Sequence, residues 1–214
     1  MKFSKVFTLT IIAIFLVSAV HGQFTDRGRF LLGSAAGFAT NTSTISYSKQ
    51  VPGTNEESPK NTQWNIAPSI GYFLFDNFAL GIGMDYTSSS ETRVGQPKTK
   101  DADLLFGPFG RLYFPFDDKA IFLQANFGFG NSADNLTVGG ENQSINTNIF
   151  AVGAGPGFTI FSNDAIGLEA LVKYNYAQSK FDIDIAGVKT TTTTKTNQIA
   201  LSLGLQVYFS GLRK

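Results

Sequence analysis

The chain contains no cysteine, and its only histidine is His21. Without cysteine, neither a disulfide framework nor thiol chemistry is available. Because His21 lies in a leader-like N-terminal segment, the rest of the chain has no imidazole. This excludes Ser-His and Cys-His nucleophilic machinery, the common types of zinc site and histidine-based proton transfer. We therefore expect a protein that is not an enzyme and has no catalytic residue, no metal site and no cofactor.

Charge is also scarce, at 15% of the 214 residues. Lys2 and Lys5 belong to the leader, so 17 − 2 = 15 basic residues face 16 acidic ones in the remainder. A near-neutral chain offers no strongly basic surface, so no nucleic-acid partner is expected.

Residues 1–22 have the pattern of a secretory signal peptide. Two lysines precede a nearly continuous apolar run from Leu9 to Val17, and small residues lead to a cut at Gly22/Gln23. The run is too short to cross a bilayer as a helix, which disfavours the alternative of a short membrane anchor. Residues 23–214 then form one domain. Since no later stretch can span as a helix, this domain either dissolves after export or enters a membrane as a barrel.

One pattern occurs three times, in residues 68–81, 108–121 and 156–167. Each copy has a Pro or Gly start, an aromatic run, an acidic or amide turn and a new alternating strand. The turns at Asp76, Asp117 and Asp164 lie 117 − 76 = 41 and 164 − 117 = 47 residues apart. Propellers have similar periods, but a blade needs four short strands and each copy here holds two long ones. Short turns that alternate with long polar stretches are typical of an up-and-down barrel.

Apolar alternation predicts eight strands, and they cover residues 29–40, 63–74, 78–86, 104–114, 120–130, 148–160, 165–176 and 197–209. One face of each strand is apolar, and the other is mainly Gly, Ala, Ser, Gln and Asn. A soluble lipocalin-like barrel would carry a charged outer face, which this second face cannot supply. The sequence therefore predicts an all-β fold, an eight-stranded antiparallel up-and-down transmembrane β-barrel with its apolar face toward lipid.

Two further features concern the ends and the irregularities of these strands. Pro68, Pro108 and Pro156 cannot donate to a ladder, so a bulge is expected at each. Four polar segments, 41–62, 87–103, 131–147 and 177–196, are expected to be extracellular loops that contact an external ligand. Within the last of these, Asp182 and Asp184 alternate with apolar residues, which indicates a strand that extends above the membrane.

Four charged residues fall on the second, lumen-facing side: Asp85, Arg111, Glu169 and Lys173. Their distances from the nearest turns predict two pairs, Arg111 with Glu169 and Asp85 with Lys173, because unpaired charge away from water is costly. Such a polar cluster either gates or binds a solute, or it is a structural plug. Eight strands leave an interior that side chains just fill, which favours the plug.

The C-terminal strand ends on alternating apolar residues and an aromatic, with Gly204, Val207, Tyr208 and Phe209 as its main features. It resembles the signal that the barrel-assembly machinery reads on outer-membrane proteins, although residues 210–214 follow it here. With the leader, this strand and the phrases at 68–73, 76–81 and 111–114, the chain resembles the small outer-membrane β-barrels of the OmpX and OmpA-barrel type. Among these it looks most like the barrel-domain proteins of Bacteroidetes-type Gram-negative bacteria.

The resemblance implies a place in the cell outer membrane, contact with outer-membrane lipid and lipopolysaccharide, and assembly by the barrel-assembly machinery. It implies no defined activity. Our leading hypothesis is a non-enzymatic outer-membrane barrel that acts through its polar loops in surface interaction, adhesion or envelope protection. The alternative is a narrow, porin-like pore or a carrier of small ligands through the lumen. An enzyme is disfavoured by the missing histidine, and a soluble periplasmic binder would need no detergent.

Overall fold

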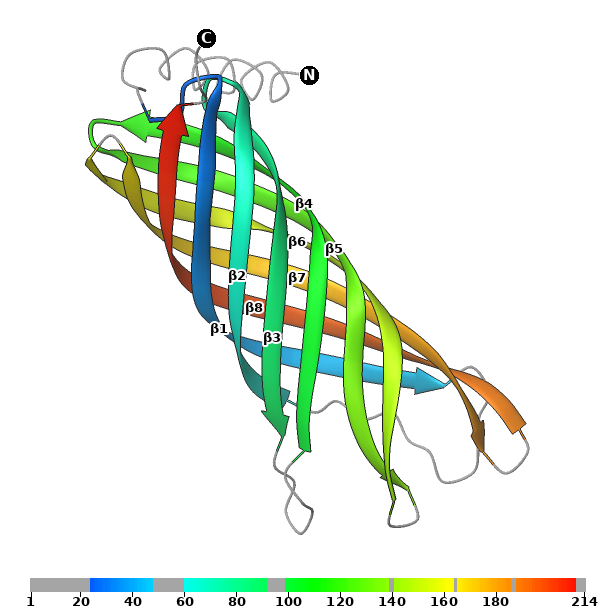
Figure 1. Cartoon of the computed structure of the whole chain (residues 1–214). Coiled ribbons are helices and arrows are strands. Elements are labelled where there is room, and N and C mark those ends of the chain that lie inside the picture. The colour runs from blue at the N-terminus through cyan, green and yellow to red at the C-terminus, as the bar shows by residue number, and fades with distance from the viewer. Residues whose placement is uncertain are drawn as a thin grey trace, which may run out of the picture.

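The computed structural model of the chain describes residues 24–47, 60–91, 99–138, 141–163, 165–185 and 188–210. The expected leader lies outside these ranges. Within them, every strand pairs antiparallel with its sequence neighbours and the first pairs with the last, which closes a barrel (Figure 1). The strands are β1 (Arg29–Tyr47), β2 (Lys60–Phe75), β3 (Phe78–Glu91), β4 (Thr99–Phe116), β5 (Lys119–Val138), β6 (Glu141–Asn163), β7 (Ile166–Ile185) and β8 (Val188–Ser210). The predicted fold class is confirmed.

The register of the ladders sets how the lumen is stacked. We followed the paired residues from strand to strand around the barrel, starting at Leu31 of β1. The path returns to β1 at Asn41, so the register shifts by 41 − 31 = 10 residues along the strand. The intermediate partners are Gly71, Gly81, Phe109, Asn126, Gly153, Asn175 and Gln198. Such a stagger tilts every strand against the barrel axis. Positions at equal depth on opposite walls are therefore offset by about half this shift from their register partners.

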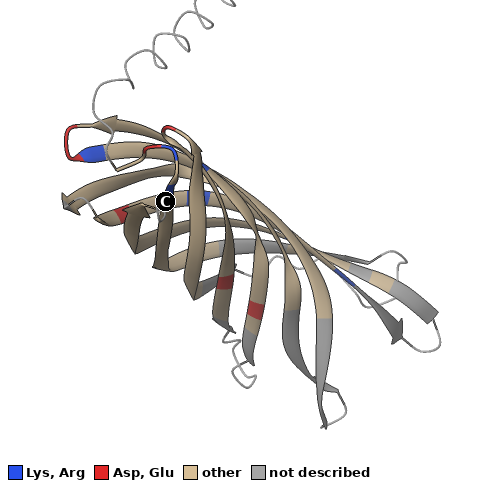
Figure 2. Cartoon of the chain, turned by 45° about the horizontal axis from the view of Figure 1, so that its top comes forward, with Lys and Arg blue, Asp and Glu red and all other residues tan. Residues whose placement is uncertain are grey.

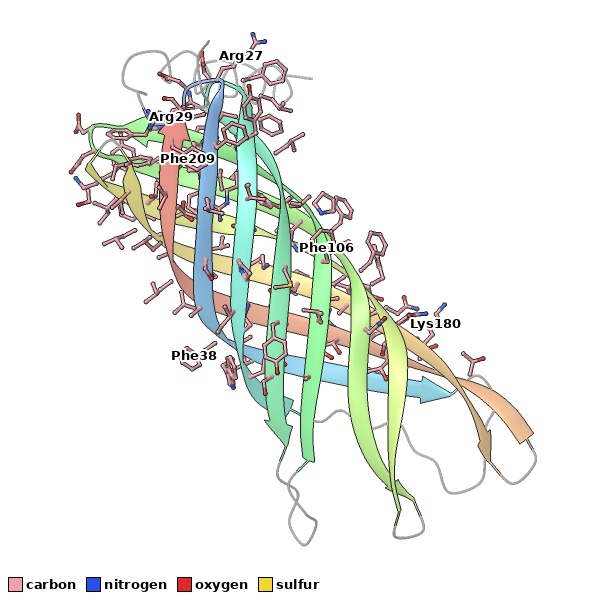
Figure 3. All side chains as sticks on the ribbon, in the orientation of Figure 1. Arg27, Arg29, Phe38, Phe106, Lys180 and Phe209 are labelled. Atoms are coloured by element: carbon pink, nitrogen blue, oxygen red, sulfur yellow. The ribbon has the colours of Figure 1, made fainter. Side chains whose placement is uncertain are left out.

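Apolar side chains cover the outside of the barrel, as the alternation predicted. Leu203 is 66% exposed and Phe38 is 73% exposed, whereas Leu31 on the inner face is fully buried. Figure 3 shows Phe38 and Phe106 pointing away from the wall. Charged residues gather near the short turns, and the described wall carries only scattered bands of charge (Figure 2). A continuous apolar belt of this kind is unsuited to water and suited to lipid. No helix in the described ranges is long and apolar enough to span a membrane.

The short turns occur where the repeated pattern placed them. Asp76 and Asn77 join β2 to β3, and Asp117 and Asp118 join β4 to β5. Asn77 has a φ of 65° and Asp117 a φ of 52°. Asn and Asp tolerate this left-handed conformation better than other non-glycine residues, which explains why the turns carry them. Asp164 of the third turn lies outside the described residues.

The prediction of four long loops was wrong over much of their length. The β5–β6 pairing continues to Val138 opposite Glu141, and the β7–β8 pairing continues to Ile185 opposite Val188. Apart from residues 181–185, where apolar residues alternate, these stretches are mainly polar on both faces, so alternation cannot reveal most of them. A ladder nevertheless needs only backbone groups, and Thr favours strands. The strand expected at Asp182 and Asp184 is confirmed. Residues 48–59 and 92–98 of the predicted loops lie outside the described residues.

The three prolines do not produce bulges, which corrects a second expectation. Pro68, Pro108 and Pro156 each pair with the preceding strand, opposite Ser34, Ile82 and Leu123. Toward the following strand the ladder is interrupted at each proline, and it resumes in the same register. The missing N–H of each proline therefore interrupts pairing only with the following strand. The hydrogen-bonded pairs before and after the proline keep the two strands in register. The described register shifts lie beside the turns instead, at Phe73/Phe75 and Phe161/Asn163.

Candidate functional site

An ion pair crosses the lumen in the half of the barrel that carries the short turns. Arg111 of β4 donates from Nη1 to both carboxylate oxygens of Glu169 on β7, at 2.7 and 3.0 Å. Both side chains are almost completely buried, with 6% and 4% exposure. The sequence predicted this pair. Burying two charges is costly unless further hydrogen bonds satisfy them, so the neighbours of the pair matter.

Three polar neighbours complete the network around the ion pair. Arg111 also donates from Nε to Gln124 Oε1 at 2.6 Å and from Nη1 to the Tyr113 hydroxyl at 3.1 Å. The Tyr208 hydroxyl donates to Glu169 Oε1 at 2.8 Å. The guanidinium group lies 4.8 Å from the centre of the Phe122 ring, in cation–π contact. Each charge is thus met by several partners, which is the arrangement that a buried pair requires.

Buried aromatic rings fill the lumen between this network and the short turns. Tyr113 packs against Phe73 and Phe122, with ring centres 5.6 and 5.3 Å apart. Tyr208 packs against Phe161 at 5.3 Å. All five rings are at least 96% buried, since none exceeds 4% exposure. We call these rings together with Arg111 and Glu169 the lumen floor. In a barrel of eight strands such a floor leaves no open channel.

The segment before β1 packs over the outer side of the floor, at the turn end. The Phe24 ring stacks on Phe161 with centres 4.3 Å apart and planes within 6°. Thr25 is fully buried, donates its hydroxyl to the Asn77 side chain and accepts the Asn77 N–H at 2.8 Å. Gly28 donates its N–H to the Phe73 carbonyl at 2.9 Å. Residues 24–28 therefore act as a cap on the side of the floor that carries the short turns.

On the other side of the floor, Phe109 and Leu171 face inward and are buried, and many of the remaining inward-facing residues are small or polar and only partly buried. They include Ala35, Asn65, Gly83, Asn126, Gly153 and Ser202. At Gly83 a Cβ would meet its nearest atoms only at 3.7 Å, which is ordinary contact. Asn65 Oδ1 and Asn126 Oδ1 are buried and have no hydrogen-bond partner among the described residues. We call this half of the lumen the upper chamber.

Asp85 and Lys173 both lie in the upper chamber, but the predicted ion pair between them was wrong. Asp85 instead accepts from Asn65 Nδ2 at 3.0 and 3.1 Å and from the Thr87 hydroxyl at 3.1 Å. No described acceptor forms a hydrogen bond or ion pair with the ammonium group of Lys173. The two residues stand on β3 and β7, which are opposite strands of the barrel. Similar depth along the barrel did not suffice to form the ion pair, because the two side chains must also reach across the full width of the lumen.

The residues of the C-terminal motif take different places. Tyr208 is part of the lumen floor, and Gly204 also faces inward, opposite Ala35. Val207 and Phe209 face outward, and Phe209 is 40% exposed. The motif therefore contributes both to the floor and to the lipid-facing belt. Its reading by the assembly machinery stays a prediction.

The sequence did not single out the aromatic part of the floor. We expected aromatic residues on the lipid face and small residues in the lumen, yet Phe73, Tyr113, Phe122 and Phe161 point inward. Their positions in the strands could have revealed them, because each of these residues alternates with the outward-facing residues of its strand and must therefore face inward. Within the described ranges, no group of three or more His, Cys, Asp or Glu side chains could hold a metal ion.

Solved structures provide the comparison with known proteins. The outer membrane protein OprG from Pseudomonas aeruginosa matches with a TM-score of 0.59 and 15% identity, over 89% of this chain and 100% of OprG. The chain has the fold of the small outer-membrane β-barrels. Neisserial surface protein A, another such barrel, matches with a TM-score of 0.50 and 19% identity, over 84% of this chain and 96% of its own. At these identities the likeness concerns the fold.

The comparisons leave activity open. The outer membrane protease OmpT from Escherichia coli also matches, at a TM-score of 0.44 and 9% identity over 90% of this chain and 100% of its own. A match at this TM-score assigns no activity to the chain. No protein-family model and no curated protein matches the sequence. The fold and its neighbours point to the outer membrane.

Proposed function

We propose that the protein is a non-enzymatic, integral outer-membrane barrel that acts at the cell surface in adhesion, surface interaction or envelope protection. In this proposal residues 1–22 direct export and are removed. The barrel-assembly machinery inserts residues 23–214, and the apolar belt contacts outer-membrane lipid and lipopolysaccharide. The extended hairpins at the end away from the short turns contact the external ligand.

The lumen floor is the observation that carries this proposal. A barrel whose periplasmic half is filled by buried rings and an ion pair offers no path for solutes, so its action lies outside the lumen. At the other end β5 pairs with β6 as far as Val138 and β7 with β8 as far as Ile185, so strand structure extends well past the apolar belt. Rigid hairpins present a binding surface at lower entropic cost than loops.

Conductance in a planar bilayer tests the closed floor. The refolded wild-type barrel is expected to give no discrete openings. A variant that combines Tyr113→Ala, Phe122→Ala and Tyr208→Ala removes three rings of the floor and is expected to conduct if it folds. Phe127→Ala is a matched control, because Phe127 faces lipid and is 54% exposed. Discrete, salt-dependent openings of the wild type would contradict the proposal and favour a pore.

A shortened hairpin tests the surface role. In the variant, residues 134–145 are replaced by an Asn-Gly turn, which suits a two-residue hairpin connection. The Ala133–Asn146 pair then closes the hairpin. Cells that display this variant are expected to lose adherence or serum survival relative to wild type, at equal amounts of folded barrel. Equal adherence and survival would show that the β5–β6 hairpin has no part in the surface role.

A further inference from the structure

Two opposite charges face one another across the upper chamber without touching. Asp85 is on β3 and Lys173 on β7, with three strands between them in either direction around the barrel. The register places Ser179 of β7 level with Asp85 along the ladder, through Leu105, Gly130 and Ile149. Lys173 lies 179 − 173 = 6 residues nearer the floor, close to the offset of five that the tilt of the barrel requires for equal depth.

Both charges have unused bonding capacity that faces the chamber. Lys173 is half-buried and has no hydrogen-bond acceptor among the described residues, although an ammonium group can donate three hydrogen bonds. Asp85 Oδ2 accepts only one described hydrogen bond, from Asn65, and a carboxylate can accept about four in all. Glu169 is already paired with Arg111 and also accepts a hydrogen bond from Tyr208. Asp85 attracts Lys173 electrostatically, and Arg111 repels it.

The lumen at this depth is partly accessible, since Asn65, Asp85 and Lys173 are each only half-buried. At Gly83, next to Asp85 on the same face, a Cβ would make ordinary contacts, whereas at Gly37 it would come within 2.5 Å of Asn65 Oδ1. Ala200, the β8 partner of Lys173, is small and buried.

We propose that the space between Lys173 and Asp85 binds a small solute that carries one carboxylate and one ammonium group. The carboxylate accepts from Lys173 Nζ on one wall, and the ammonium donates to Asp85 on the other. The solute enters from the extracellular end and stops at the lumen floor, so the site is a blind pocket. This goes beyond the proposed surface function, and its failure would leave the conductance result unchanged.

The test uses the refolded, isotope-labelled barrel in detergent micelles and solution NMR. Three probes of similar size separate the contributions: β-alanine carries both charges, propionate carries only the carboxylate, and propionamide is neutral. We expect saturable shifts of the Gly155, Lys173 and Ala200 amides with β-alanine. We expect binding of propionate to be at least about tenfold weaker, and no saturation with propionamide.

Matched variants localise the effect. Lys173→Gln removes the charge and is expected to weaken β-alanine binding about tenfold or more. Lys180→Gln is the control, because Lys180 is on the same strand but exposed outside the barrel. It should bind like wild type. Gly83→Leu should block the chamber while both charges stay in place, so it tests the site even if Lys173→Gln fails to fold.

Equal saturation by all three probes, or wild-type β-alanine affinity in both Lys173→Gln and Gly83→Leu, would overturn the proposal. So would the absence of saturable shifts with every probe, since the two charges would then be bridged by water alone. Equal affinity for propionate and β-alanine would show that the ammonium group of the solute does not bind Asp85, which would contradict the proposal of a solute with two opposite charges.

Discussion

Arg111 and Glu169 are 58 residues apart in the chain, yet their side chains form a 2.7 Å ion pair across the floor of the barrel lumen. The pair is held by the barrel closure, because β4 and β7 have two strands between them. The pair contributes to stability because hydrogen bonds with Gln124, Tyr113 and Tyr208 compensate both buried charges, and the attraction between the charges alone would not suffice. This relationship leads to the first prediction.

We expect the loss of one member of the Arg111–Glu169 pair to destabilise the barrel more than the loss of both. Glu169→Gln leaves Arg111 buried without its counter-charge and should lower the free energy of unfolding by about 3–5 kcal/mol. The double variant Arg111→Met with Glu169→Leu leaves no buried charge and should cost less than the sum of the single changes. Urea unfolding of the barrel in lipid vesicles measures Glu169→Gln, the double variant and its two single changes, Arg111→Met and Glu169→Leu. Strict additivity of the two single changes would contradict the coupling.

Two lumen glycines are expected to respond in opposite ways to an added methyl group. At Gly157 a Cβ would run into the Phe122 ring of the lumen floor, whereas at Gly83 the nearest atoms are 3.7 Å away. Gly157→Ala should therefore destabilise the barrel by about 1–3 kcal/mol through overpacking, and Gly83→Ala should be nearly neutral. The same unfolding assay compares the two. A neutral Gly157→Ala would mean that the floor repacks freely.

The cap formed by residues 24–28 is expected to stabilise the barrel from outside its strands. Phe24→Ala removes the stack on Phe161 and should cost about 1 kcal/mol or more. Arg27→Ala is the control, because Arg27 is exposed and contacts Asp76 through its backbone N–H at 2.8 Å. Its effect should stay within about 0.5 kcal/mol. If Phe24→Ala unfolds at the same urea concentration as wild type, the cap does not contribute to stability.

The β4–β5 turn offers a pH-dependent check outside the membrane. The Lys119 ammonium donates to Asp118 at 2.7 Å, and this hydrogen bond holds the pKa of Asp118 below its ordinary value of 3.8. The contribution of this carboxylate to stability is thus present above that value and lost as the pH falls through its lowered pKa. Lys119→Gln should return the pKa of Asp118 toward 3.8. A carboxyl NMR titration that is unchanged by Lys119→Gln would refute the contact.

Predictions from the sequence succeeded where they depended on alternation. A strand turns successive side chains to opposite faces whatever its tertiary surroundings, so the lipid face of β8, with Leu203 and Leu205, could be read directly. The turns at Asp76 and Asp117 were equally local, because their left-handed residues select Asn or Asp. Alternation revealed the strand at Asp182 and Asp184, but it failed for most of the hairpin extensions, where both faces are mainly polar.

The lumen shows the limit of such reasoning. Depth along the strands was enough to predict the contact between Arg111 and Glu169, but the same argument wrongly joined Asp85 to Lys173. Depth says nothing about reach across the barrel or about competing donors, and here Asn65 and Thr87 reach Asp85 first. The inward aromatic rings were missed because we assigned aromatic residues to the lipid face by their type, although their alternating positions in the strands placed them in the lumen.

The sequence by itself determined the number of strands, the apolar face of each, the short turns and the absence of thiol and, beyond the leader, imidazole chemistry. These are consequences of local periodicity and composition. Only the tertiary structure decided which charges meet, which end of the lumen is closed and where a chamber remains. The reason is the ten-residue shift of the register around the closed barrel, which brings inward side chains from different strands to one depth and which no single strand encodes.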